Sequence, residues 1–211
     1  MTQAPNKTPR QNTRTDLIRT AEQLFAEKGL GGVSVREITR AAGAKNESAL
    51  HYHFGGMEPL IREVFAHRYR GIERARLDIL ASMDDEQRSD IHALMHAAIA
   101  PMFEACQDDH GRRYTRFCVQ LATDPRFDLD ALTESIGMES VEEVDRLFRQ
   151  ALSHLPPDIV SLRLRRLFTL SLLLAADHVK QFKAGTRQAL EEAIEEAVKS
   201  LGGFMSAPAR K

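Results

Sequence analysis

The side chains best suited to chemistry gather between positions 45 and 53, where most residues are polar. If residues 45–54 form a helix, Ala49, Leu50 and Phe54 turn inward and anchor it to the rest of the fold. The other side then carries an ammonium, amide, hydroxyl, imidazole and phenol. Such groups donate hydrogen bonds to, and accept them from, base edges and phosphates. These exposed candidates are Lys45, Asn46, Ser48, His51 and Tyr52, with Glu47 beside them. A metal pair of His51 and His53 is disfavoured, because residues two apart on a helix do not face each other.

A second short helix, predicted over residues 34–42, must hold this segment in place. Ser34 and Glu37 form a Ser-x-x-Glu pattern, which is typical of a helix N-terminus. The helix ends near Gly43, leaving a turn of about three residues before the next one. Two short helices joined by such a turn indicate a helix-turn-helix, whose second helix enters the major groove of double-stranded DNA.

Apolar residues follow a helical period from Thr13 onward, and no segment alternates as a strand does. We therefore predict an all-α protein of about nine helices. The first helix buries one face, formed by Leu17, Ile18, Ala21, Leu24 and Phe25. A three-helix DNA-binding domain is expected over 13–56 and a larger helical domain over 57–204. Residues 1–12 should form a disordered arm, 126–137 a short irregular segment with one or two helical turns, and 205–211 a C-terminal tail.

The composition supports this division. The chain has 211 residues, of which 43% are hydrophobic, so it can bury a substantial core. Residues 1–80 hold 13 Lys and Arg against 9 Asp and Glu, whereas the remainder holds 16 against 21. A basic first part suits a DNA-binding domain. No apolar run approaches the ~20 residues that cross a bilayer. The polar N-terminus lacks the apolar segment of an export signal, so we expect a cytoplasmic protein without a membrane partner.

Four stretches of residues 14–65 carry a family resemblance. Residues 17–29, 34–38, 41–43 and 51–55 resemble the first helix, second helix, turn and recognition-helix end of TetR-family repressors. By this resemblance Ser34 and Arg36 touch the DNA backbone, the 45–49 segment and His51 read bases, and Tyr52 and His53 bind phosphates. Two features depart from the family pattern. The spacing from Gly43 to Phe54 is one residue longer, and Met57 stands where a lysine is common.

The resemblance also implies a homodimer that binds a palindromic operator, because two helix-turn-helix units then reach successive major grooves about 34–36 Å apart. In the family, the last two helices pair with those of the partner. The candidates here are Leu167, Leu170, Leu174, Leu190, Ile194 and Val198. The second domain would then bind a small-molecule effector. Apolar, adaptable side chains with one histidine are the candidates to line its pocket: Met95, Ile99, Met102, Phe103, Tyr114, Phe117 and His178. An ordinary core position is the alternative for each.

We therefore predict a sequence-specific transcriptional regulator, a repressor released from its operator by a small apolar effector. No cofactor, metal or enzymatic activity is expected, since the sequence has no phosphate-binding glycine loop, nucleophile elbow or His-Glu-x-x-His pattern. Two alternatives stay open. One is a DNA-binding regulator that responds to oxidation of Cys106 or Cys118, and the other is a helical protein-interaction module that does not bind DNA.

Overall fold

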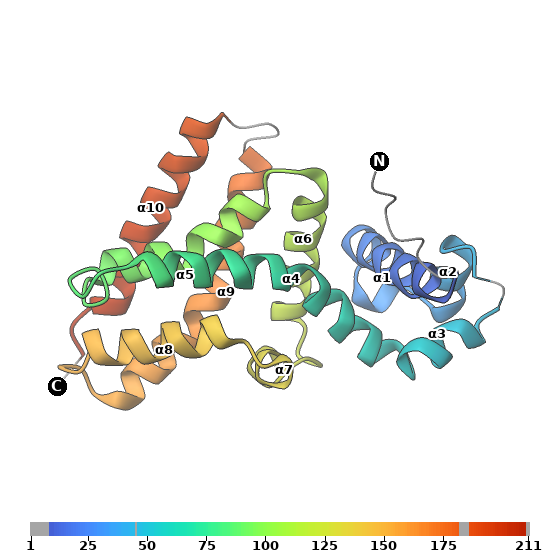
Figure 1. Cartoon of the computed structure of the whole chain (residues 1–211), viewed down its shortest axis with the longest axis horizontal. Helices are drawn as coiled ribbons and strands as arrows, with labels where there is room; N and C mark the ends of the chain where they lie inside the picture. The colour runs from blue at the N-terminus through green and yellow to red at the C-terminus, as the bar shows by residue number, and fades with distance from the viewer. Residues whose placement is uncertain (1–8, 45, 182–185, 210–211) are drawn as a thin grey trace, which may run out of the picture. The chain divides into compact units, whose positions relative to one another are not determined.

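The computed structural model describes residues 9–44, 46–181 and 186–209, and all regular structure in these ranges is helical. Ten α-helices follow one another along this described part of the chain (Figure 1). They divide into two compact units, Met1–Arg68 and Tyr69–Lys211. Within the described ranges, no helix combines the length and the apolar character needed to cross a membrane. The all-α prediction is confirmed.

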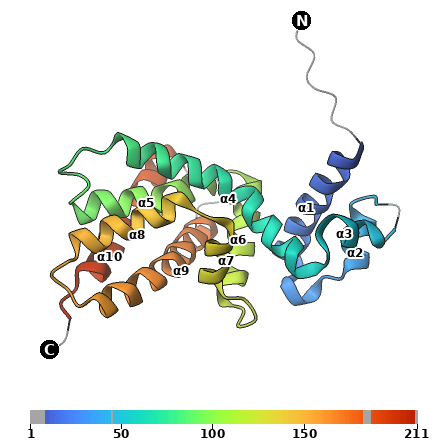
Figure 2. The same ribbon diagram turned by 60° about the horizontal axis from the view of Figure 1, so that its bottom comes forward.

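The first unit contains α1 (Pro9–Lys28), α2 (Val35–Ala41), α3 (Ser48–Phe54) and the beginning of α4 (Met57–Ser82) (Figure 2). The predicted inner face of α1 is mostly confirmed, since Leu17, Ala21 and Phe25 are fully buried. The arm predicted over residues 1–12 is wrong for residues 9–12, which form the first turn of α1. Proline is well tolerated in a first helical turn, where an amide hydrogen would have no partner. Residues 1–8 lie outside the described residues.

This unit extends past the predicted boundary at residue 56, because the first turns of α4 belong to its core. Leu60 and Phe65 are fully buried. The Nε of Arg68 donates to Oε2 of Glu22 at 3.0 Å, and the Glu22 side chain is only 3% exposed. An ion pair with so little solvent around it holds α4 firmly against α1.

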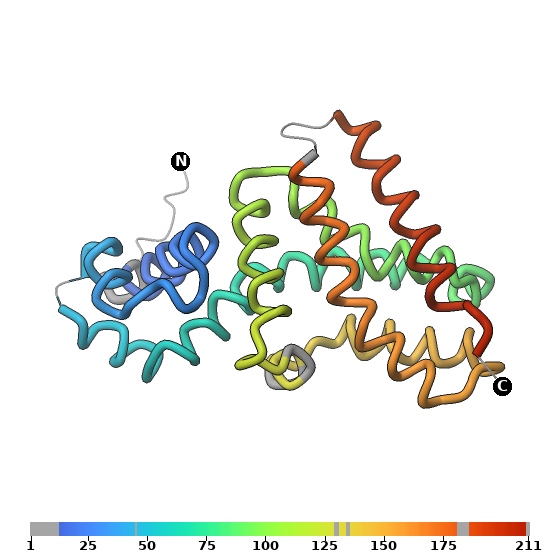
Figure 3. Tube along the Cα trace, turned by 180° about the vertical axis from the view of Figure 1, so that it is seen from behind, coloured from blue at the N-terminus to red at the C-terminus, as the bar shows by residue number. Residues whose placement is uncertain are grey.

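The second unit contains the rest of α4 and six further helices. These are α5 (Ile91–Ala105), α6 (Asp109–Thr123), α7 (Leu129–Ile136), α8 (Glu139–Ala151), α9 (Pro157–Gln181) and α10 (Arg187–Ser206). The helix α10 packs along α5 and α9, while α6 packs on α9 (Figure 3). The predicted count of about nine helices did not include α7, whose two turns correspond to the one or two helical turns expected within residues 126–137. The C-terminal tail predicted from residue 205 begins two residues later, because α10 continues to Ser206.

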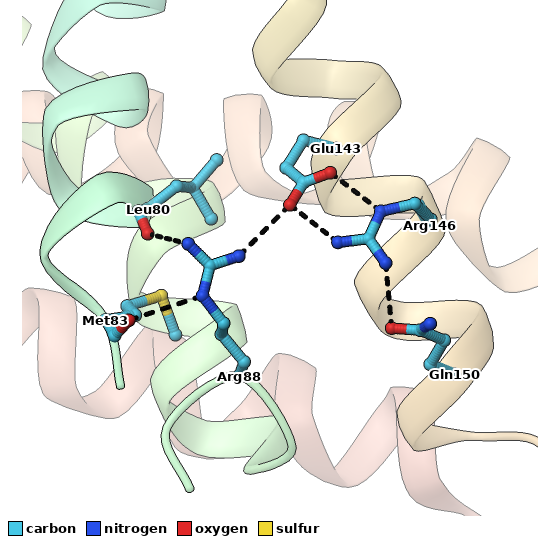
Figure 4. Close-up of polar contacts among 6 residues, drawn as sticks. All are labelled: Leu80, Met83, Arg88, Glu143, Arg146 and Gln150. Atoms are coloured by element: carbon cyan, nitrogen blue, oxygen red, sulfur yellow. Dashed lines mark hydrogen bonds and ion pairs between the residues drawn. The ribbon is translucent and has the colours of Figure 1, made fainter. Parts of the chain in front are cut away.

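Arg88, in the loop after α4, ties the end of that helix to α8 (Figure 4). Its guanidinium donates to the carbonyl of Leu80 at 2.6 Å and to that of Met83 at 3.3 Å. Carbonyls at a helix C-terminus lack intrahelical partners, so this contact satisfies them. Arg88 also donates to Glu143 of α8 at 3.2 Å. Arg146 and, to a lesser extent, Arg88 lower the pKa of the Glu143 carboxyl, which therefore remains charged as their shared acceptor.

Candidate functional site

The helix α2 begins as its sequence predicts. Ser34 Oγ accepts a hydrogen bond from the backbone N–H of Glu37 at 3.2 Å, which caps the helix. The Glu37 carboxylate accepts from Nζ of Lys28, and this contact lowers its pKa. The last residue of α1 is thereby joined to the first turn of α2. On the outer side of that turn, the side chain of Arg36 is 83% exposed.

The turn between α2 and α3 is longer than the sequence predicts. Residues 42–44 and 46–47 lie outside both helices, and α3 begins at Ser48 rather than at residue 45. Gly43 has a φ of +67°, in the left-handed region that favours glycine. The N–H of Ala44 then donates to the carbonyl of Thr39 at 2.9 Å, which closes the end of α2. Asn46 is therefore an exposed turn residue, not a helical one.

The helix α3 has one buried and one exposed face. Leu50 is fully buried and Phe54 nearly so, as predicted for the anchoring side. Ser48, His51 and Tyr52 are exposed and share the opposite face, because residues three and four apart are neighbours on a helix. Tyr52 is 72% exposed, which is unusual for a large aromatic side chain without a partner molecule.

Two other predicted DNA-binding residues, His53 and Lys45, are not part of this exposed face as described. His53 is half-buried, and its ring lies 5.1 Å from that of Tyr52 in an edge-to-face arrangement. His53 is therefore less exposed than Ser48, His51 and Tyr52. Lys45 lies outside the described residues.

A contact between α2 and the start of α3 was not foreseen from the sequence. The Nε of Arg36 lies 3.8 Å from Oε1 of Glu47, and both side chains are well exposed. The opposite charges were visible in the sequence, but only the path of the turn brings them together. Arg36 consequently lies beside the exposed face of α3, and the two form one polar surface.

The second unit has a cavity of about 610 Å³ lined mainly by α4, α5, α8 and α9. This volume lies within the range of roughly 300–1,000 Å³ found for small-molecule sites. Much of the lining is apolar: Ala98, Ile99, Val141, Val144, Leu164, Leu167 and Phe168. Exposed charged residues, Glu142, Arg149 and Arg165, also contribute. Arg76 is different, because it lines the cavity while only 4% exposed.

The sequence located this cavity poorly. Of the seven candidate pocket residues, only Ile99 lines it. The other six are buried in the packed interior: Met95, Met102, Phe103, Tyr114, Phe117 and His178. Four of them pack as two pairs of rings, with centroid distances of 6.1 Å for Tyr114 and Phe117 and 6.0 Å for Phe103 and His178. We therefore assign these six to the core.

Arg76 is held by a hydrogen-bond network that spans three helices. Its Nε donates to the carbonyl of Ala98 at 3.1 Å, and its Nη1 donates to Tyr69 Oη and to Ser140 Oγ, the latter at 3.0 Å. Ser140 in turn donates to Glu73, through its hydroxyl at 2.6 Å and its backbone N–H at 2.8 Å. Burial raises the pKa of Tyr69, so this hydroxyl stays neutral beside the guanidinium. The network fixes Arg76 at the cavity wall.

The candidate dimer residues separate into three groups. Leu190, Ile194 and Val198 are buried within this subunit, where α10 packs against α5 and α9, so their side chains offer no surface to a partner. Leu167 lines the cavity instead. Leu170 is half-buried and Leu174 is 37% exposed. Leu173, which is not among the predicted dimer residues, is 43% exposed on the same side of α9.

Comparisons with known families cover both units. Residues 17–64 match the model described as bacterial regulatory proteins, tetR family. Residues 96–207, just over half of the chain, match the model of the tetracyclin repressor-like C-terminal domain. The chain belongs to the TetR family. As a TetR-family protein it falls among regulators rather than enzymes.

Individual relatives of this TetR-family protein are more distant. The HTH-type transcriptional repressor KstR2 of Rhodococcus jostii (strain RHA1) is 33% identical over 96 residues, which are 41% of this chain and 47% of that protein. The chain thus aligns with less than half the length of this curated relative. A TetR family regulator from Shewanella sp. PV-4 superposes with a TM-score of 0.70 at 18% identity, covering 93% of this chain and 99% of that one. PfmR from Thermus thermophilus superposes with a TM-score of 0.57 at 18% identity, covering 98% and 100%. At these identities the two structures establish the fold alone.

Proposed function

We propose that this TetR-family protein is a sequence-specific transcriptional regulator that represses by binding a palindromic operator as a homodimer. The exposed face of α3 is the observation that supports this most. Ser48, His51 and Tyr52 project from a helix anchored by the buried Leu50, inside the segment that matches the family's DNA-binding domain. We propose repression rather than activation because the relative KstR2 of R. jostii is described as a repressor.

The residues of this surface divide between phosphates and bases. Arg36 and Ser34 flank α3 and are suited to the DNA backbone, since the guanidinium is exposed and the Ser34 hydroxyl hydrogen can still donate. The 45–49 segment, including Lys45, Asn46 and Ser48, contacts base edges together with His51. Tyr52 and His53 contact phosphates.

The second unit supplies the dimer contact and the effector site. On α9, the row formed by Leu170, Leu173 and Leu174 is the apolar surface proposed to meet the same row of a partner subunit. The 610 Å³ cavity is proposed to hold a small-molecule effector. An effector that prefers the state with lower operator affinity releases the DNA in proportion to that preference.

Operator binding is tested by fluorescence anisotropy on duplexes from the region immediately upstream of the coding sequence, with random duplex as competitor. We expect Tyr52→Ala to weaken specific binding by at least about tenfold, the loss expected for one good DNA contact. Gln23→Ala, at an exposed position of α1, is the matched control and should bind as the unaltered protein does. Equal affinity of the unaltered protein for upstream and random duplexes at moderate salt would reject the function.

The thiol-based alternative has no support in the environment of Cys106. This residue is 2% exposed, and its sulfur donates to the Met102 carbonyl at 3.0 Å and contacts Thr115 Oγ1 at 2.8 Å. Burial raises the pKa of the thiol to about 11, so the reactive thiolate is scarce at neutral pH. Cys118 is also buried. Neither thiol has the exposed, electropositive setting of a redox sensor.

A further inference from the structure

The guanidinium of Arg76 is a buried cation, and its direct partners among the described side chains are all neutral. It donates to a carbonyl, a phenol and a serine hydroxyl, and the nearest carboxylate in this network, Glu73, is reached only through Ser140. Burying an ionised group costs several kcal/mol unless an opposite charge or full hydrogen bonding offsets it. The fold therefore maintains a positive charge at this wall of the cavity with incomplete compensation.

One nitrogen of Arg76 remains available to a ligand. Among the hydrogen bonds of the described residues, those of Arg76 use Nε and Nη1, and none is formed by Nη2. Since Arg76 lines the cavity, its remaining N–H groups are the charged donors best placed to receive a bound molecule. A guanidinium edge binds a carboxylate especially well, because charge and donor geometry both match.

The other arginines of the lining are less suited to this role. Arg149 is exposed and already pairs with Asp145, and it donates to Ser161 at 2.9 Å. Arg165 is exposed, so solvent screens its charge. A buried cation next to apolar walls therefore sets the chemistry that the cavity selects.

We propose that the effector is a monocarboxylate with an apolar body, whose carboxylate binds Arg76 while the body lies against the aliphatic and aromatic lining of α5, α8 and α9. This rests on the proposed function only in treating the cavity as an effector site. A single free guanidinium nitrogen and a nearby Glu73 favour one negative charge over the two or more of a phosphate ester.

The test is direct binding to the purified full-length chain, without DNA, by isothermal titration calorimetry. The probes are straight-chain and phenylalkyl carboxylic acids of 6–14 carbons, each paired with the primary alcohol of the same skeleton. We expect at least one acid to bind about tenfold or more tightly than its alcohol, the difference expected for a charge-assisted hydrogen bond. Equal binding of every acid and its alcohol, or no saturable binding of any probe, overturns the proposal.

Variants locate the carboxylate. Arg76→Gln should remove the acid-over-alcohol preference, while Arg166→Gln, at an exposed position of α9 outside the cavity lining, should retain it. Loss of the preference in Arg165→Gln but not in Arg76→Gln would place the carboxylate at the exposed edge and overturn the assignment to Arg76. If Arg76→Gln does not fold, Glu73→Gln decides, because removing the competing carboxylate should strengthen acid binding and leave alcohol binding unchanged. Unaltered acid binding in Glu73→Gln would then overturn the proposal. DNA anisotropy reports failure of the proposed function separately, since no DNA is present in these titrations.

Discussion

Replacing Arg36 with glutamine should weaken operator binding while leaving the fold intact. The side chain is 83% exposed, and its ion pair with Glu47 spans 3.8 Å between two solvated groups. Pairs of this kind contribute about 0–1 kcal/mol, and surface substitutions usually change stability by no more than about 0.5 kcal/mol. Urea unfolding of Arg36→Gln should therefore match that of the unaltered protein.

The loss in DNA binding should instead appear as a change in salt dependence. Each phosphate neutralised by a cationic side chain adds about 0.9 to the slope of log affinity against log salt. Because a homodimer carries two copies of Arg36, the slope should become shallower by about 1.8. Between 50 and 200 mM salt, the unaltered protein should then lose about tenfold more affinity than the variant.

Anisotropy titrations at four salt concentrations, with one operator duplex, measure this slope. Glu47→Gln is the matched control, because it removes the carboxylate that competes with phosphate for Arg36 and leaves the cation in place. It should bind more tightly and retain the full slope. Identical slopes for the unaltered protein and Arg36→Gln would refute the assignment of Arg36 to a phosphate.

Three further predictions concern the packing around the sites. Gly111→Ala should destabilise the fold by about 3 kcal/mol, because its Cβ would lie 1.5 Å from a carbonyl oxygen at the end of α5. Gly71→Ala, with open space around it in α4, should be neutral or slightly stabilising in the same urea titration. Arg68→Met should lower the free energy of unfolding by about 3 kcal/mol, because it leaves the Glu22 carboxylate buried without its partner. Glu22→Gln should lower it by only about 1 kcal/mol, because the Arg68 side chain is one-third exposed and stays solvated. Equal losses of stability in the two variants would contradict this asymmetry. Iodoacetamide should label Cys106 at pH 8 only after unfolding, because burial raises its pKa to about 11, and rapid labelling of the folded chain would reopen the thiol-based alternative.

Helix positions and caps followed from the sequence because they depend on short-range interactions. Ser34 caps α2 as its sequence pattern predicts, and Thr186 caps α10 with the same geometry by accepting from the N–H of Ala189 at 3.2 Å. In both cases donor and acceptor lie three residues apart, so the signal is local. The inner faces of α1 and α3 were likewise visible in the spacing of their apolar residues. The start of α3 was misplaced because residues 45–47 are all polar, so the spacing of apolar residues does not mark where the helix begins.

The cavity could not be located in this way, because an apolar side chain has the same sequence signal whether it lines a void or fills one. Met95 and Ile99 lie on the same helix and are both buried, yet only Ile99 reaches the cavity. Which of them does so depends on how α8 and α9 pack against α5.

Local periodicity, capping and turn residues were thus enough to determine an all-α chain with a helix-turn-helix and an exposed polar helix face. Arg76 shows what only the tertiary structure decided. It stands in a charged stretch of α4 that reads as solvent-exposed, yet it is buried. Its partners Ala98 and Ser140 come from positions 22 and 64 residues away. A buried charge is tolerated only where distant groups converge to hydrogen-bond it, and that convergence has no local signature in a sequence.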